Sequence, residues 1–251
     1  MPKPLNEETG RAHTDDVCAL LRLAPRLQCL ADCVPEGARL ADVGTDHGYL
    51  PVWLLQNGRI EYAIASDINA APLEHARRTA AEYGVSARMD FRLCAGVDAV
   101  SREEADVVAI AGMGGETIVA ILDAAAWDWR GVTLLLQPMT KAELLRRWLT
   151  EHGFRIAYER LVRDKGVIYA VLTVEAGESE PLSNAEAWCG ALSRHDPLYG
   201  EYARDRAAKL ERAATGLRSA KEPDEALIAR YEADAAALRD MIKEWEDAYR
   251  T

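Results

Sequence analysis

The segment from residue 40 to residue 51 constrains the fold of this chain more than any other, and it reads LADVGTDHGYLP. An apolar run ends in Asp42 and Gly44, a polar turn follows, and a helical pattern begins at Tyr49. Glycine permits turns that other residues resist, and it lets a ligand approach the backbone closely. The start of a helix offers unpaired N–H groups and the positive end of a dipole. The segment therefore predicts a first strand, a nucleotide-binding turn and a helix.

The next apolar run, residues 62–67, also ends in an acid, Asp67. In a βαβ unit, an acid at the tip of the second strand accepts hydrogen bonds from the hydroxyls of a ribose. The two acids Asp42 and Asp67 thus predict a ligand that contains a ribose. The alternative is an ordinary βαβ unit in which the acids only cap helices and turns.

The glycine spacing in the turn argues against a dinucleotide. A dinucleotide site has the pattern GxGxxG, which places a pyrophosphate at the helix N-terminus, whereas this turn reads GTDHG. Asp46 would lie where the pyrophosphate has to be, and like charges repel. A cationic ligand suits this position better. We therefore expect S-adenosyl-L-methionine, which has a sulfonium, an ammonium group and a ribose but no phosphate.

Three motifs point to one family. Residues 42–51 read DVGTDHGYLP, residues 110–115 read IAGMGG, and residues 135–138 read LLQP. They resemble the DIGSDHAYLP, AGMGG and LQP motifs of the bacterial tRNA (adenine-N1)-methyltransferases that modify adenosine 22. The resemblance runs from about Arg26 to Val174 and continues more loosely into the C-terminus. It implies a class I, S-adenosylmethionine-dependent enzyme that methylates N1 of adenosine 22 in tRNA.

Apolar segments alternate with helical patterns, which predicts an α/β fold with a mostly parallel sheet. Strands are expected at residues 40–45, 62–67, 89–94, 107–111 and 132–137, with helices at 49–56, 71–83, 115–125 and 141–152. Two last strands, 154–163 and 167–174, flank the turn signal DKG and predict an antiparallel hairpin. The resemblance implies a Rossmann-like class I methyltransferase sheet of seven strands in the order 3-2-1-4-5-7-6.

Helical patterns are expected at both ends of the chain. Residues 14–34 have apolar positions at helical spacing, with Pro25 as a break. The polar segment 177–181 separates an expected Rossmann-like domain, residues 1–177, from a helical arm, residues 178–251. In this arm, two helices at about 197–217 and 224–249 have near-heptad apolar spacing, which predicts a coiled-coil hairpin.

The net charge of −11 is unusual for a protein that binds tRNA, because such proteins present a basic surface. Residues 194–221 carry seven basic and four acidic side chains, an excess of three positive charges. Arg204, Arg206 and Arg212 in this segment are the expected tRNA contacts. The alternative is a solvated coiled-coil surface with ion pairs within the helix.

The carboxyl ends of the strands should bring the motifs together, near the point where strands one and four diverge. We expect Asp42 and Gly44 at the methionine part of the cofactor, Asp67 at the ribose and Ile68 against the adenine. The full set of expected cofactor-binding residues is Asp42, Gly44, Thr45, Asp46, Tyr49, Leu50, Asp67, Ile68, Gly96, Val97, Gly112, Met113 and Gly114.

Adenine N1 has a free lone pair, so its methylation needs no base, and the product is a cation. Catalysis then rests on positioning and on nearby negative charge. Asp46 is the expected source of this charge, with His47 and Gln137 as further catalytic residues. Gly115 and Pro138 are expected to contact the substrate. For His47, the alternative is a residue at the start of a helix that only hydrogen-bonds to the backbone. For residues 112–115, the alternative is a tight turn that opens a helix.

Two positions depart from the family pattern. Ala95 replaces an acid suited to hold the adenine amino group, so backbone groups or Asp98 must take over that contact. Met139 replaces an asparagine after LQP and removes its hydrogen bond. Two alternatives therefore stay open: a methyltransferase that acts on another RNA or a small molecule, and a non-catalytic RNA-binding relative.

The cysteines and the hydropathy of the chain indicate in which compartment the protein acts. The five cysteines form no CxxC pair and their number is odd, which favours a reduced, cytoplasmic protein without a metal site. No apolar run approaches the roughly 20 residues that cross a bilayer, and the N-terminus lacks a signal-peptide core. We expect a monomer or weak homodimer that binds tRNA and no membrane.

Overall fold

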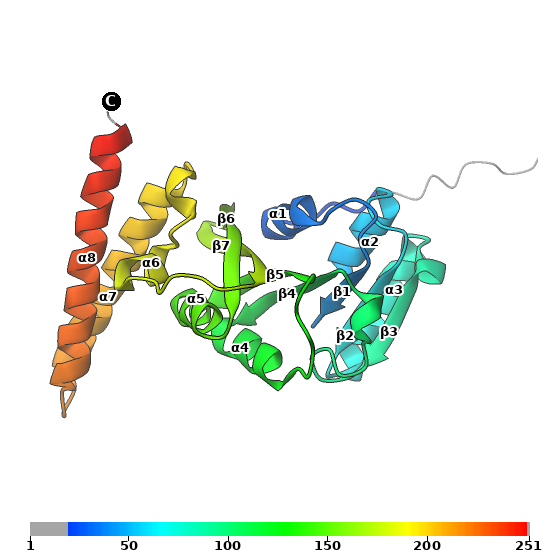
Figure 1. The fold of residues 1–251 in the computed structure, drawn as a ribbon, viewed down its shortest axis with the longest axis horizontal. Helices are drawn as coiled ribbons and strands as arrows, with labels where there is room; N and C mark the ends of the chain where they lie inside the picture. Colours follow the sequence, from blue (N-terminus) through cyan, green and yellow to red (C-terminus); the bar gives the residue numbers. More distant parts are fainter. Residues whose placement is uncertain (1–19, 250–251) are drawn as a thin grey trace, which may run out of the picture.

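The computed structural model describes residues 20–249 and contains one seven-stranded sheet with helices on both faces (Figure 1). The strands are β1 (Leu40–Val43), β2 (Ala63–Asp67), β3 (Met89–Leu93), β4 (Val107–Gly114), β5 (Thr133–Thr140), β6 (Phe154–Asp164) and β7 (Val167–Ala176). Their order is β3-β2-β1-β4-β5-β7-β6, and β7 runs antiparallel to both neighbours. The predicted α/β class, strand order and closing hairpin are confirmed.

Two apolar cores lie on the two faces of the sheet. The first lies under α1 (Pro25–Cys33), α2 (Tyr49–Gln56) and α3 (Ala70–Glu82), and the second under α4 (Gly115–Ala124) and α5 (Ala142–Glu151). On β5, Leu135 belongs to the first core while Leu134 and Leu136 belong to the second. This alternation follows from the two-residue period of a strand. The parallel strands are therefore apolar on both faces.

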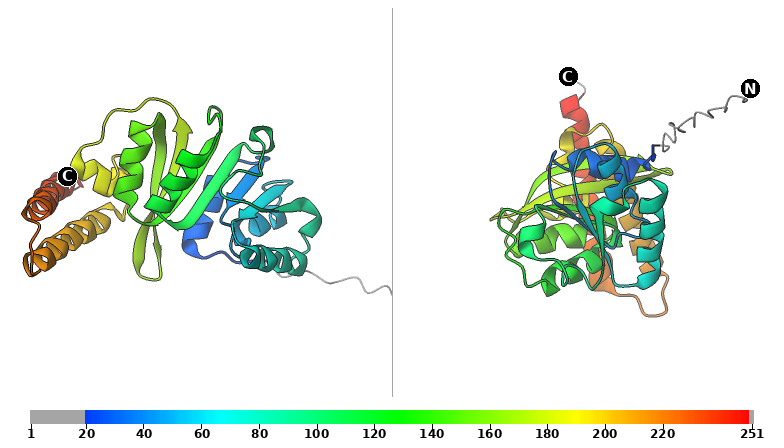
Figure 2. Two further views of the ribbon diagram at one scale, coloured as in Figure 1. Left: turned by 90° about the horizontal axis from the view of Figure 1, so that it is seen from below. Right: turned by 90° about the vertical axis from the view of Figure 1, so that its right-hand side faces the viewer.

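The C-terminal helices form an arm beyond β6 and β7 (Figures 1 and 2). They are α6 (Asn184–Cys189), α7 (Tyr199–Arg218) and α8 (Glu225–Tyr249). Buried residues of α7 recur at heptad spacing, namely Ala203, Ala207, Leu210 and Ala214, which is typical of a coiled coil. The predicted pairing of α7 and α8 is confirmed, whereas α6 was not predicted. The domain boundary at residue 177 stays a prediction.

The N-terminal helix begins later than its apolar pattern predicts. Residues 20–24 are not helical, and α1 begins at Pro25. Proline suits the first helical position because it lacks an N–H, and it holds the preceding residue, Ala24, in an extended conformation (φ −62°, ψ 152°). The earlier part of the predicted helix, with Cys18, lies outside the described residues. No helix between residues 20 and 249 is long and apolar enough to span a bilayer.

The fourth and fifth strands are longer than predicted and end side by side. After a register shift, Met113 pairs with Pro138 and Gly114 pairs with Thr140. Gly112 adopts a positive φ of 76° at this irregularity, as expected of a β-bulge. Residues 112–114 are thus a bulged strand end rather than a tight turn.

A buried ion pair joins the sheet to the arm. Arg146 of α5 and Glu159 of β6 are both almost completely buried and form this pair. Arg146 Nη1 also donates hydrogen bonds to the carbonyls of Ala187 (2.9 Å) and Trp188 (3.2 Å) in α6. Burial raises the pKa of Glu159, and the charge of Arg146 offsets part of this rise. One guanidinium therefore fixes α5, β6 and α6 relative to one another.

Replacing Arg146 alone should strongly destabilise the protein. Arg146→Met leaves the Glu159 carboxylate buried without a partner, which costs about 3–5 kcal/mol in free energy of unfolding. The double variant Arg146→Met/Glu159→Leu should recover most of this loss, because no buried charge remains. Urea denaturation followed by circular dichroism measures both values.

The exposed ion pair between Arg163 and Glu201 serves as the control. Arg163→Met should cost less than about 1 kcal/mol, because exposed pairs contribute little. An Arg146→Met protein as stable as the wild type would contradict the role given to this pair.

Candidate active site

A cavity of about 180 Å³ lies at the carboxyl ends of β1, β2 and β4. Five residues that the sequence assigned to the cofactor line it, namely Gly44, Asp67, Ile68, Gly96 and Met113. The cavity lies where ligands bind in open α/β sheets. Cys94, Thr117 and Ile121 also line it and were not predicted, because no motif marks them.

Gly44 allows close approach to the backbone in this cavity. Its φ is +70°, and its N–H donates to the carbonyl of Ser66 (2.8 Å). A side chain at this position would overlap the terminal methyl of Met113, which lies against the turn. The same applies at Gly96, where a Cβ would approach Ile121 to 3.0 Å. Both glycines therefore let a side chain of the cavity wall, Met113 or Ile121, pack directly against the backbone.

Asp42 lies beneath the turn and is 6% exposed. Its Oδ2 accepts a hydrogen bond of 2.6 Å from the hydroxyl of Thr45. Burial raises the pKa of Asp42 to about 6, the negative charge of Asp67 adds to this rise, and the Thr45 hydrogen bond opposes it. A cation at the turn would favour the ionised carboxylate.

Asp67 occupies the tip of β2, as predicted, and is half-buried. Its Oδ1 accepts the N–H of Asn69 (2.8 Å), which holds the carboxylate at the entrance of α3. Leu50 and Val97, in contrast, are buried in the two apolar cores and support the turns from below.

Asp46 lies at the exposed surface of the turn, with 72% of its side chain accessible. Its φ of +50° is one that aspartate tolerates better than most residues. His47 stacks on Tyr49 (5.1 Å between ring centroids) and on His75 (4.9 Å). The Nε2 of His47 lies 3.8 Å from Asp46 Oδ1.

Asp46, His47 and His75 also form the one cluster within residues 20–249 whose atoms approach a metal-ligand arrangement. The two imidazoles are nearly parallel, at 13°, so their lone pairs lie in separate planes and do not converge on one point. The arrangement is that of stacked rings at the surface of the turn and not that of a metal centre.

Gln137 is completely buried at the end of β5. Its Oε1 accepts hydrogen bonds from Arg26 Nη1 (3.0 Å) and from the N–H of Gly112 (3.2 Å). Arg26 also pairs with Asp164 (3.5 Å) in the hairpin. These contacts fit a residue that positions the bulged end of β4. Sequence motifs did not indicate Arg26, since its partners are distant in the chain.

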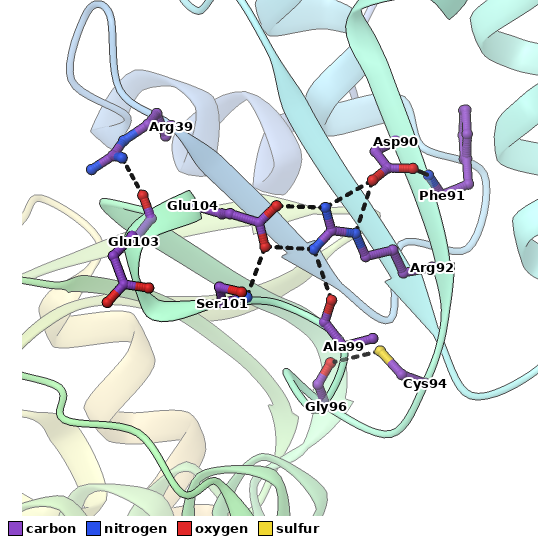
Figure 3. A network of polar contacts seen from close by, with 10 residues as sticks. All are labelled: Arg39, Asp90, Phe91, Arg92, Cys94, Gly96, Ala99, Ser101, Glu103 and Glu104. Carbon is purple, nitrogen blue, oxygen red and sulfur yellow. Dashed lines mark hydrogen bonds and ion pairs between the residues drawn. The ribbon is translucent and has the colours of Figure 1, made fainter.

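Arg92 braces the loop that follows β3 (Figure 3). It pairs with Asp90 (2.8 Å) and Glu104 (2.7 Å) and donates to the carbonyl of Ala99 (2.7 Å). Hydrogen bonds from Arg92, and then from the Ser101 N–H, lower the pKa of Glu104 to about 2. The network holds residues 94–101, which include Gly96 of the cofactor cavity.

The residues expected to contact substrate lie in two separate places. Gly115 and Pro138 are buried beside the bulged strand end, next to Gly114. On α7, the exposed Arg204 pairs with Glu246 (3.2 Å). Arg206 is half-buried, pairs with Asp205 and lies over the ring of Tyr202, whereas Arg212 is exposed. Arg206 thus makes an ion pair within its helix, as the alternative interpretation expects, whereas the pair of Arg204 joins α7 to α8.

Comparisons with known proteins agree with this geometry. Residues 23–172 match the methyltransferase domain family, so the fold and the strand-end site define a Rossmann-like methyltransferase. The chain is 36% identical over 161 residues to the Bacillus subtilis protein named tRNA (adenine(22)-N(1))-methyltransferase, covering 64% of this chain and 68% of the relative. The chain belongs to this methyltransferase family.

Solved structures are similar over most of the chain. The B. subtilis m1A22 tRNA methyltransferase is 27% identical with a TM-score of 0.75, covering 90% of this chain and 99% of that one. A Streptococcus pneumoniae protein solved in complex with S-adenosyl-L-methionine is 31% identical with a TM-score of 0.74, covering 85% and 97%.

Cofactor affinity should depend on pH through Asp42. Its carboxyl is ionised above about pH 6 and protonated below, so a cationic cofactor must displace a proton at lower pH. We expect the affinity for S-adenosylmethionine to be constant above about pH 7 and to fall by up to about tenfold per pH unit below pH 6. Calorimetric titration between about pH 5 and pH 8 measures this.

The matched control is Asp42→Asn, which cannot ionise. It should bind more weakly above pH 7 and lose the pH dependence. If this variant retained the wild-type pH profile, another group would be responsible.

Proposed function

We propose that this protein transfers a methyl group from S-adenosyl-L-methionine to N1 of adenosine 22 in tRNA. The observation that carries the proposal is the pair of strand-end acids, Asp42 and Asp67, on either side of a glycine turn. This arrangement suits a cofactor with a ribose and positive charge. The similarity to a relative named for this activity supports the choice of tRNA.

The lining of the cavity suits S-adenosylmethionine, because it combines the carboxylate of Asp67 with the apolar side chains of Ile68 and Met113. Asp67 would hold the ribose hydroxyls and Ile68 would lie against the adenine. Asp42 and Gly44 would meet the methionine part. Ala95 cannot hold the adenine amino group through its side chain, so we assign that contact to the backbone of the braced 94–101 loop or to Asp98.

The bound cofactor supplies a methyl group activated by the positive charge on sulfur. Adenine N1 would accept this methyl group with its own lone pair, and the electron pair of the broken carbon–sulfur bond would stay on sulfur. No proton has to be removed from the adenine. The protein therefore aligns the ring nitrogen and stabilises the positive charge that develops on the base.

We assign this electrostatic role to Asp46, because its exposed carboxylate lies in the turn that begins with the cavity residue Gly44. His47 is held between two aromatic rings and shapes the turn. Met113 can pack on the face of the base through its thioether. Gln137 and Arg26 position the bulged strand end on which Met113 lies.

Further parts of the proposal concern partners and setting. We propose that Arg204, Arg206 and Arg212 lie on the arm surface that approaches tRNA, although the first two already form ion pairs. The protein would act in the cytoplasm as a monomer or weak homodimer. Gel filtration with light scattering measures the oligomeric state.

The activity should appear as 1-methyladenosine at one position of tRNA. Incubation of the protein and cofactor with a tRNA transcript should yield 1-methyladenosine in a nucleoside digest. A transcript with guanosine at position 22 should yield none. Methylation elsewhere, or of a small molecule only, would favour another methyltransferase, and no product with intact cofactor binding would favour a non-catalytic relative.

Asp46→Asn should separate catalysis from binding. Asparagine also tolerates a positive φ, so the turn is preserved while the charge is lost. We expect a fall in kcat of about tenfold or more, because a carboxylate near developing charge acts in the transition state, with little change in cofactor affinity. Normal turnover with weakened cofactor binding would instead assign Asp46 to the cofactor.

A further inference from the structure

A groove of about 520 Å³ runs between α5, α6 and the first turns of α8. It is larger than the cofactor cavity and lies on the arm side of the sheet. Three basic and three aromatic side chains contribute to its lining, namely Lys141, Arg147, Arg230, Trp148, Trp188 and Tyr231. No residue of α7 lines it, so it is distinct from the surface that carries Arg204 and Arg212.

The ring of Trp188 is held in place, and the two arginines keep their charge available. Trp188 Nε1 donates to the buried carboxylate of Asp234 (3.0 Å), which fixes its ring. Arg147 Nη2 donates a hydrogen bond to the uncharged side-chain amide of Asn184 (2.8 Å). Within residues 20–249, neither Arg147 nor Arg230 takes part in an ion pair. This differs from Arg204 and Arg206 on α7, which are paired.

One end of the groove lies next to the bulged end of β4. Lys141 directly follows β5, and its carbonyl lies where a side chain on Gly115 would be. The other end is formed by Tyr231 and Arg230 on α8. The groove therefore leads from the bulged strand end, beside the cofactor cavity, to the helical arm.

The chemistry of the target base explains what such a groove would hold. Adenine N1 lies on the edge used for base pairing, so an adenine that is methylated there must be unpaired. Its neighbours in the strand are then also partly unstacked. Proteins hold such splayed nucleotides by stacking bases on aromatic side chains and by contacting phosphates with basic ones.

We propose that this groove binds the tRNA strand next to the target adenosine, with a flanking base on Tyr231 or Trp188 and phosphates at Lys141, Arg147 and Arg230. The inference rests on the proposed function and adds the surface that the substrate uses. Glu143 and Glu151 also line the groove, so its net charge is only one positive. The groove would therefore attract only the few phosphates that contact its basic side chains. Such a contribution does not require the whole protein to be basic, and the chain is acidic.

The salt dependence of binding follows from the number of phosphates. Three contacts to single-stranded RNA predict a contribution of about −2 to the slope of log affinity against log salt, since each contact gives about −0.7. Removing Arg147 and Arg230 should reduce the magnitude of the slope by about 1.4.

The test compares two double charge reversals in the full-length protein. Arg147→Glu/Arg230→Glu alters the groove, and Arg204→Glu/Arg212→Glu makes the same change of charge on α7. Fluorescence anisotropy with labelled tRNA gives the affinity and its salt slope. Calorimetry with S-adenosylmethionine checks that each variant keeps a folded cofactor site.

We expect the groove variant to bind tRNA at least tenfold more weakly, with unchanged cofactor affinity and a shallower salt slope. The α7 variant should lose less. Tyr231→Ala should also weaken binding, but without changing the salt slope, because it removes stacking and no charge. Equal losses in the two charge variants, or normal tRNA binding by the groove variant, would overturn the proposal and leave the groove to a protein partner.

Failure of the groove proposal is distinguishable from failure of the proposed function. If the wild-type protein methylates tRNA while the groove variant binds tRNA normally, only the groove assignment is wrong. If the wild type neither binds nor methylates tRNA, the proposed function itself is wrong.

Discussion

The buried carboxylate of Asp42 is the constraint on which the cofactor site depends. Burial makes ionisation of this group costly, and the neighbouring Asp67 adds repulsion. A single hydrogen bond from Thr45 offsets only part of this cost. A cation at the turn would relieve the repulsion, whereas a phosphate would increase it. The same strand-turn-helix unit that binds dinucleotides elsewhere is thereby suited to a sulfonium cofactor.

A second buried charge fixes the geometry between this site and the arm. Arg146 joins α5, β6 and α6, so the first turns of α8 lie over the helix that begins directly after β5. Arg147 lies on α5 and Arg230 on α8, so this arrangement helps to form the groove between them. The cofactor site and the proposed RNA surface are thus connected through the contacts of Arg146. Neither site requires a large basic surface on this acidic protein.

Much of the fold could be predicted from the sequence, because periodicity and strand-end motifs report local structure. Pro25 was recognised as a break, but only the structure shows that the helix begins there. The bulge at Gly112 depends on pairing with β5, which no local pattern reveals. In contrast, α6 has a readable signal: Ser183 and Glu186 form a capping box.

The site was predictable where a motif lies at a strand end and unpredictable where contacts span the chain. Gly44, Asp67 and Gly96 meet at the cavity as expected. Arg26 reaches Gln137 across 111 positions, and Arg92 acts through a network that no spacing indicates. The ion pair of Arg204 likewise depends on Glu246 of α8, so counting charges along one helix overestimates its free positive charge.

The most direct test of this account is calorimetric titration of the full-length protein with S-adenosylmethionine and, separately, with NAD. The two strand-end acids and the turn residue Asp46 predict one bound S-adenosylmethionine per chain and no measurable binding of NAD. Comparable binding of NAD, or no binding of S-adenosylmethionine, would contradict the central claim that these acids select a cationic cofactor without phosphate.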